Sequence, residues 1–197
     1  MKKGSLYIIL ALFCFYSFSA YSQINCITDH TLPPYMTLVS VEPETGNTNF
    51  TWTLSHSTDI AAYIIYSYEN SDGMPLPDTI WNPLATSYTY TSTVTKYKSV
   101  SYVIAAMRLP RCTSKLSNAL NTIFCSSEIE TCNKVINLKW NRYPDYPDSV
   151  LEYKIYVSVN GSPLSEMYSV DNKTTNYTIS EFVTDAQHSF AVKAILE

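Results

Sequence analysis

Apolar and polar residues alternate in short runs along most of the chain, which is the pattern of half-buried β-strands. Residues 151–158 read Leu-Glu-Tyr-Lys-Ile-Tyr-Val-Ser, so every second side chain is apolar and the intervening positions are mostly polar. Because side chains on a strand point alternately to its two faces, this pattern fixes which face turns inward. No amphipathic helix of ordinary length is visible, and the sequence predicts an all-β protein.

Similar runs, rich in Thr, Tyr, Val and Ile, recur at short spacing between turn signals such as residues 42–47 and 70–77. Strands are expected at 36–41, at Phe50, Trp52 and Leu54, from Tyr63, and at 79–81, 87–91, 100–108 and 116–124. A second series is expected at 135–140, 151–159, 166–170, 176–179 and 189–196, with a hairpin turn at Asn160 and Gly161. Many short strands with regular turns indicate an antiparallel β-sandwich.

The second series is a copy of the first. Four landmark pairs are separated by 88 to 90 residues, namely Trp52 and Trp140, Tyr63 and Tyr153, Tyr88 and Tyr177, and Tyr102 and Phe190. A constant spacing over several landmarks favours a shared fold. We therefore expect two domains, at residues 23–125 and 126–197. The second copy ends before its closing strand, so either the chain is a fragment of a longer polypeptide or a neighbouring segment supplies the strand.

The N-terminus has the organisation of a secretory signal peptide. Lys2 and Lys3 precede an apolar run over residues 6–18, and Ala20 and Ser22 provide small residues at the cleavage positions. The apolar run is short for a membrane span. Residues 1–22 are therefore predicted to be a leader that is cleaved near Ser22, with a mature chain that begins at Gln23 and is secreted or held at the cell surface.

Charge and cysteine content narrow the function classes. The formal net charge is −4, and loss of Lys2 and Lys3 makes it −6, which argues against a nucleic-acid partner. The mature chain keeps an even number of cysteines, namely Cys26, Cys112, Cys125 and Cys132. In an exported protein without Cys-x-x-Cys spacing, disulfides are the expected state.

A resemblance follows from the residues of the second copy. It carries a Trp-ending strand, Tyr-x-Ile-x-Val at 153–157, Thr-x-Tyr-x-Ile at 175–179, and Phe190, Val192 and Ala194 on its last strand. These positions resemble fibronectin type III modules over residues 31–197. Residues 59–66 and 112–118 are further similar to the tandem modules of gliding-motility-associated surface proteins that use type IX secretion. The resemblance implies two tandem immunoglobulin-like β-sandwiches, the second without its last strand.

The resemblance also implies a cysteine pairing. In such modules the N-terminal segment and the loop between the last two strands lie at the same pole, so Cys26 is expected to pair with Cys112. Cys125 and Cys132 either close a short loop or, if residues 126–131 are extended, lie too far apart to be joined. In the second case Cys132 is expected to need a partner beyond Glu197.

No catalytic, cofactor-binding or metal-binding residue is predicted. His30, His56 and His188 lie outside any catalytic or zinc motif. Asp59, Asp145 and Asp148 follow the Trp-ending strands, where paired carboxylates sometimes hold calcium or act on a glycosidic bond. Nothing in the sequence brings them together, and solvated turn residues are the better interpretation.

One face of the first copy is predicted to be a contact surface. When the register of residues 151–158 is carried over to the first copy, Tyr63 and Ile65 point inward. The predicted outward set is Ile64, Tyr66, Tyr68, Val103 and Met107. An exposed apolar face commonly marks a partner site. The alternative is that the N-terminal segment or the second domain covers it.

These observations predict exported spacer or adhesive modules without catalysis, which bind a protein or a glycan at the cell surface. Further domains of the same polypeptide are expected, and no cofactor is. The alternative is a carbohydrate-binding accessory module of a secreted glycoside hydrolase, which predicts an adjacent catalytic domain. A small enzyme is a third hypothesis, but it requires converging polar residues that the sequence does not show.

Overall fold

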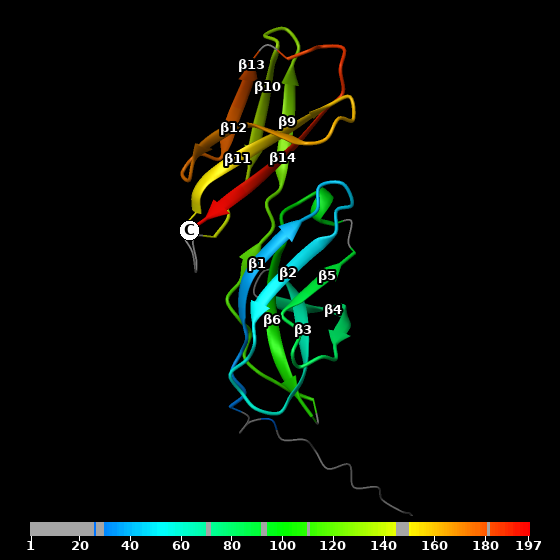
Figure 1. The fold of residues 1–197 in the computed structure, drawn as a ribbon, viewed down its shortest axis with the longest axis vertical. Coiled ribbons are helices and arrows are strands. Elements are labelled where there is room, and N and C mark those ends of the chain that lie inside the picture. The colour runs from blue at the N-terminus through cyan, green and yellow to red at the C-terminus, as the bar shows by residue number, and fades with distance from the viewer. Residues whose placement is uncertain are drawn as a thin grey trace, which may run out of the picture.

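The structure is a computed structural model that describes residues 26, 30–69, 72–91, 94–109, 111–144, 150–180 and 182–197. The predicted leader, Asp145 and Asp148 lie outside the described residues. The described strands form two groups that pair only within themselves, and the groups lie end to end along the long axis of the molecule (Figure 1). We call them the first module, β1 to β8, and the second module, β9 to β14.

The first module is a sandwich of two sheets. One sheet has the order β1-β2-β5, and the other has the order β4-β3-β6-β7, with β8 also paired to β6. The strands are β1 (Tyr35–Val41), β2 (Thr48–Thr53), β3 (Ile60–Glu69), β4 (Asp72–Ile80), β5 (Ser87–Tyr90), β6 (Ser101–Arg108), β7 (Cys112–Thr113) and β8 (Leu120–Asn121). A short 3-10 helix, η1 (Val94–Lys96), precedes β6.

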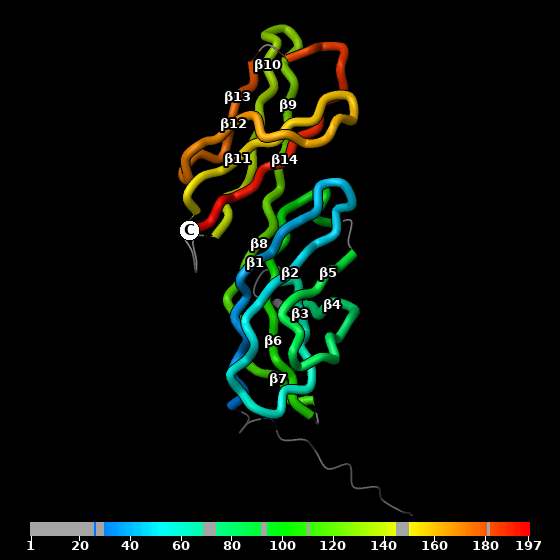
Figure 2. The backbone as a smooth tube through the Cα atoms, in the orientation of Figure 1, coloured from blue at the N-terminus to red at the C-terminus, as the bar shows by residue number. Residues whose placement is uncertain are grey.

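The second module repeats this arrangement with one difference. One sheet has the order β13-β10-β9 and the other β12-β11-β14. The strands are β9 (Cys125–Glu130), β10 (Val135–Trp140), β11 (Val150–Val159), β12 (Ser165–Asp171), β13 (Asn176–Ser180) and β14 (His188–Leu196). Strand β14 corresponds to β6, but among the described strands nothing pairs with its outer edge as β7 and β8 pair with β6 (Figure 2).

The predicted inward register is confirmed in both modules. In the first, Tyr63 and Ile65 of β3 lie in a core that β6 completes with Tyr102, Ile104 and Ala106. In the second, the core includes Tyr153 and Ile155 of β11. Each landmark Trp packs beside the first Tyr of the next strand, with ring centroids 5.6 Å apart for Trp52 and Tyr63 and 5.8 Å for Trp140 and Tyr153.

Three strand predictions need correction. Leu54 does not point into the core, because β2 ends at Thr53 and Leu54 is 38% exposed. Residues 72–77, predicted as a break, are part of β4, an edge strand on which Pro75 lies opposite Tyr66. Proline is tolerated there because an edge strand leaves part of its backbone unpaired. The predicted strand at 116–124 is reduced to the two residues of β8.

The hairpin turn between β11 and β12 follows the prediction. Asn160 and Gly161 have φ of 52° and 74°, the left-handed conformation that Asn and Gly adopt most readily. Residue Ser162 closes the turn by donating its N–H to the Val159 carbonyl at 3.1 Å. The local sequence is therefore sufficient to specify this connection.

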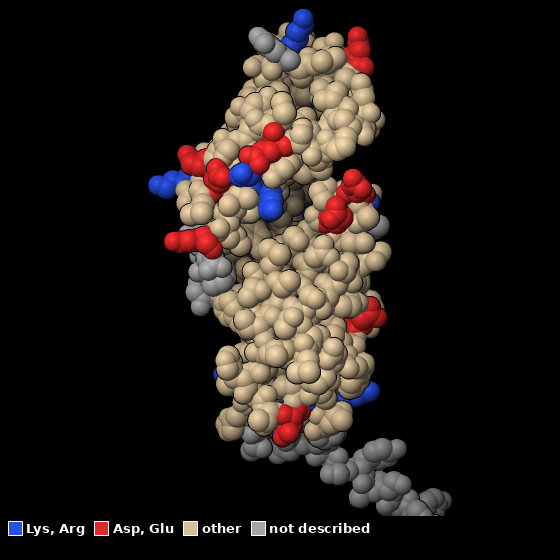
Figure 3. Space-filling model, viewed as in Figure 1, with Lys and Arg blue, Asp and Glu red and all other residues tan. Residues whose placement is uncertain are grey.

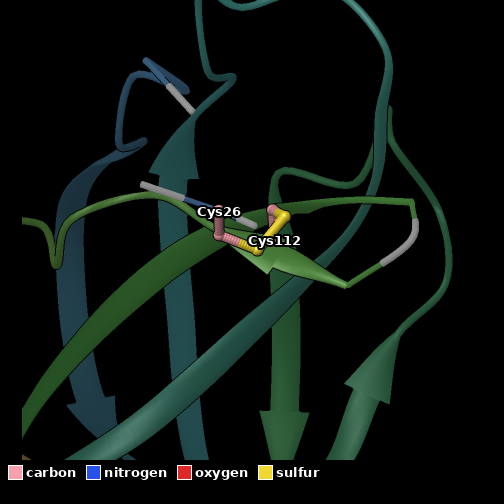
Figure 4. Close-up of a disulfide and its surroundings, with 2 residues drawn as sticks. All are labelled: Cys26 and Cys112. Carbon is pink, nitrogen blue, oxygen red and sulfur yellow. A yellow bond between two sulfur atoms is a disulfide. The ribbon is translucent and has the colours of Figure 1, made fainter. Parts of the chain in front are cut away.

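The cysteines are divided between a disulfide and two thiols. Cys26 and Cys112 are joined, as predicted, and the bond ties the N-terminal segment to β7 (Figure 4). Cys125 and Cys132 are free. Strand β9 is extended from Cys125 to Glu130, which is about 17 Å between the Cα atoms of these two residues. Cys132 lies in the turn beyond Glu130, so its distance from Cys125 exceeds the roughly 7 Å between Cα atoms that a disulfide can span.

Candidate functional site

The predicted contact surface on the first module is exposed only in part. Val103 and Met107 are 2% and 4% exposed, although they belong to the outward set of β6. They therefore offer no free surface to a partner, and this part of the prediction is wrong. Ile64, Tyr66 and Tyr68 on β3 are half-buried. Burial raises the pKa of the Tyr66 hydroxyl above its ordinary value.

The residues considered for catalysis do not converge. Within the described ranges no three His, Cys, Asp or Glu side chains lie close enough to hold a metal ion. His188 contacts the Val183 carbonyl at 3.0 Å and packs beside Phe182 and Phe190, so it belongs to the local packing of the second module. Burial raises the pKa of the Cys125 thiol to about 11, which keeps it protonated and unreactive at neutral pH.

The junction between the modules is held by buried polar contacts. The Tyr143 side chain, 4% exposed, extends from the second module to β1 of the first. Its hydroxyl donates to the Val39 carbonyl at 3.5 Å and accepts the Val39 N–H at 3.3 Å. The backbone N–H of Tyr143 donates to the Tyr153 hydroxyl at 2.9 Å, which fixes Tyr143 to the core of its own module.

Asn141 forms hydrogen bonds with the segment that connects the two modules. Its side-chain oxygen accepts the Phe124 N–H at 2.7 Å, and its amide donates to the Thr122 carbonyl at 3.0 Å. Asn121 donates to the Arg142 carbonyl at 3.3 Å from the first module. These contacts stabilise an end-to-end arrangement, since each bond joins residues on opposite sides of the connection.

A cavity of about 570 Å³ lies at this junction. The first module contributes residues 38–43 from the end of β1 and the turn that follows, and the second contributes Tyr156, Leu164 and residues 191–194 and 196. Ile123 and Tyr143 complete the wall. Figure 3 shows the surface hollowed between the two modules, with charged side chains near the rim. A volume of this size is in the range of ligand-binding pockets.

The cavity wall includes the edge of β14 with which no described strand pairs. Asn160 donates its N–H to the Gln187 carbonyl at 2.8 Å, which identifies that pair as hydrogen-bonded. Because hydrogen-bonded pairs alternate along an antiparallel ladder, residues 189, 191 and 193 bond to β11. Phe190, Val192 and Ala194 therefore direct their N–H and C=O groups away from β11, toward the open edge.

The cavity could not be predicted from the sequence. The cavity depends on how β1 of one module faces β14 of the other, and no local pattern encodes that orientation. Tyr143 lies 88 residues after Ser55, and the backbone N–H groups of both residues donate to the hydroxyl of the first Tyr of the next strand.

The strand order and the facing of the two sheets define two tandem immunoglobulin-like sandwiches of fibronectin type III topology. No protein-family model matches the chain, and no curated protein does. Among solved structures, the chain is similar to the FN1-FN3 domains of chicken CNTN1, at 14% identity over 83% of this chain and 63% of that one, with a TM-score of 0.36.

It is also similar to a segment of two fibronectin type III domains from chicken tenascin. That match has 14% identity over 83% of this chain and 91% of the segment, with a TM-score of 0.35. The chain spans 63% of the length of the CNTN1 structure. The sequence identities and TM-scores of both matches are too low to carry an argument about function, and the fold assignment rests on the strand order.

Proposed function

We propose that the chain is a non-catalytic pair of exported modules that act as a rigid spacer and present a binding surface at their junction. The observation that carries this proposal is the buried hydroxyl of Tyr143, which bonds both backbone groups of Val39 across the junction. A flexible spacer would not require such a contact. Its burial costs free energy unless its hydrogen bonds are made, so the modules lose stability if they separate.

The disulfide and the predicted leader support the export of the chain. The Cys26–Cys112 disulfide is typical of proteins in oxidising compartments. The predicted leader would direct the mature chain out of the cytoplasm. The resemblance of residues 59–66 and 112–118 to gliding-motility-associated modules supports a bacterial cell-surface or secreted protein that uses type IX secretion. No helix among the described residues has the length and apolar character needed to cross a bilayer. Ile64, Tyr66 and Tyr68 remain a second candidate contact surface.

The rotational motion of each module in solution shows whether the junction is rigid. For the mature chain from Gln23, ¹⁵N relaxation is expected to fit one common rotational diffusion tensor for both modules. In a Tyr143→Phe and Asn141→Ala double variant, the modules are expected to tumble at separate rates. Each junction hydrogen bond that the variant removes should lower the free energy of unfolding by about 1 kcal/mol, and each sandwich should stay folded.

The matched control is Tyr97→Phe, since Tyr97 is 77% exposed. It removes one tyrosine hydroxyl far less buried than that of Tyr143, and the common tensor is expected to persist. Separate tumbling of the modules in the unmodified chain would reject the rigid spacer.

A carbohydrate-binding accessory role is the alternative. It is supported by Trp81 and Tyr97, which are 58% and 77% exposed on the first module. Aromatic rings at the surface combine a large apolar area with a polar group and suit the faces of sugar rings. Retardation of the mature chain by polysaccharide in affinity electrophoresis, and loss of that retardation in Trp81→Ala, would favour this function over the protein-binding one.

A further inference from the structure

The Cys26–Cys112 disulfide encloses most of the first module in one covalent loop. Cys26 precedes β1, and Cys112 opens β7 beside the end of β6, so strands β1 to β6 all lie between the two cysteines. The bond joins Cα atoms that are 5.4 Å apart (Figure 4). The sequence separation of 86 that it bridges would span about 280–310 Å if the chain were fully extended. The bond is therefore a covalent bypass of this part of the chain.

One segment of the first module remains on the covalent path from the disulfide to the second module. We call residues 112–122 the closing segment. It runs antiparallel to β6, since Cys112 lies opposite Arg108 and the Thr122 N–H donates to the Val100 carbonyl at 3.0 Å. Because β6 follows the long axis of the molecule, the closing segment crosses the first module toward the second (Figure 1). Tension along the backbone passes through this segment and not through β1 to β6.

The closing segment is already almost extended. Its ten residue steps from Cys112 to Thr122 lie along the eight steps from Arg108 back to Val100. Eight steps of a strand cover about 27 Å, whereas ten fully extended steps reach about 36 Å. The segment therefore lengthens by only about 10 Å when it is pulled straight.

Hydrogen bonds hold the closing segment to both sheets. The Ser117 N–H donates to the Ile104 carbonyl of β6 at 2.9 Å, and the Ser117 hydroxyl accepts the Ile104 N–H at 2.9 Å. On the other sheet, Asn118 donates its amide N–H to the Met36 carbonyl at 2.8 Å and accepts the Met36 N–H at 2.9 Å. Bonds between antiparallel segments lie across the strand direction, so a pull along the segment loads them together.

The second module has no such bond among its described residues. Cys125 and Cys132 are free, and strand pairing and the core hold β9 to β14 together. When the second module unfolds under tension, its backbone can therefore extend. The two modules share a fold but differ in how far they can be stretched.

We propose that the disulfide makes the first module a tension-resistant clamp of nearly fixed length within the exported spacer. A pull on the chain passes from Cys26 to Cys112 and along the closing segment, while β1 to β6 carry no tension through their backbone. Surfaces built on these strands, such as that of Ile64, Tyr66 and Tyr68, then keep their shape under a pull that stretches the second module. The inference rests on the proposed spacer function and adds resistance to tension to it.

Single-molecule force spectroscopy tests the clamp. The mature chain is held by short tags at Gln23 and Glu197 and pulled until no further lengthening occurs. Its contour length is expected to be about 300 Å shorter than that of a Cys26→Ser and Cys112→Ser double variant, because the bond bypasses a separation of 86 residues. The contour length of a fully stretched chain does not depend on stability, so the comparison holds even if the double variant is unfolded.

The matched control is Cys132→Ser, which removes an exposed free thiol and should leave the contour length unchanged. The unmodified chain should show one long unfolding event, that of the second module. A second long event in the unmodified chain, or a contour length equal to that of the double variant, would overturn the clamp.

The relaxation measurement on the junction is made without tension and has a separate outcome. Modules that tumble separately reject the rigid spacer. A rigid chain whose contour length equals that of the double variant rejects the clamp alone.

Discussion

Replacing Cys112 with Ser is expected to destabilise the first module by about 4 kcal/mol. The Cys26–Cys112 disulfide closes a loop with a sequence separation of 86, and a crosslink over a loop of this length strongly restricts the unfolded chain. Chemical denaturation of the variant, followed by the fluorescence of the landmark tryptophans, measures the change. The first module is expected to unfold at lower denaturant concentration while the second keeps its midpoint.

The matched control for this prediction is Cys132→Ser. Cys132 is exposed and free, so its replacement is expected to change the free energy of unfolding by no more than about 0.5 kcal/mol. Peptide mapping without reduction should recover the Cys26–Cys112 linkage and unmodified thiols at Cys125 and Cys132. A Cys112→Ser variant as stable as the unmodified chain would show that the disulfide does not hold the fold.

Replacing Trp52 or Trp140 with Ala is expected to cost about 3–5 kcal/mol in the module that carries it. Each indole is at most 4% exposed and packs against the first Tyr of the next strand, so truncation leaves a large cavity at the centre of the sandwich. The expected result is the loss of one unfolding transition in each variant, measured by calorimetry, while the other module keeps its own.

Trp81→Ala is the control for the tryptophan series. Its side chain is 58% exposed after the end of β4, and its replacement is expected to change stability by only about 0.5 kcal/mol. Equal costs at Trp52 and Trp81 would contradict the assignment of the landmark tryptophans to the two cores.

The strand interiors were predictable because side-chain direction on a strand has a period of two. The alternation at 151–158 specified Tyr153 and Ile155 as inward, and the repeat carried that register to Tyr63 and Ile65. The alternation gives the direction of each side chain but does not show whether another segment packs over it. Val103 and Met107 point away from the core and are still buried, and no periodicity along a strand reveals what lies over its outer face.

Other features escaped prediction for local reasons. Strand β9 reads Cys-Ser-Ser-Glu-Ile-Glu, is largely exposed and has no apolar alternation, so only its pairing with β10 makes it a strand. Strand β4 contains two prolines and was interpreted as a break, but an edge position tolerates them. The cavity at the junction required the relative placement of two modules, which depends on single contacts such as that of Tyr143 with Val39.

Hydrogen exchange of the mature chain tests the central claim, that the Tyr143 hydroxyl joins the two modules, most directly. The Val39 N–H donates to that hydroxyl and should exchange slowly in the unmodified chain. In Tyr143→Phe the Val39 N–H should exchange much faster, while the amides of both cores stay protected. Rapid exchange of the Val39 N–H in the unmodified chain would contradict the account.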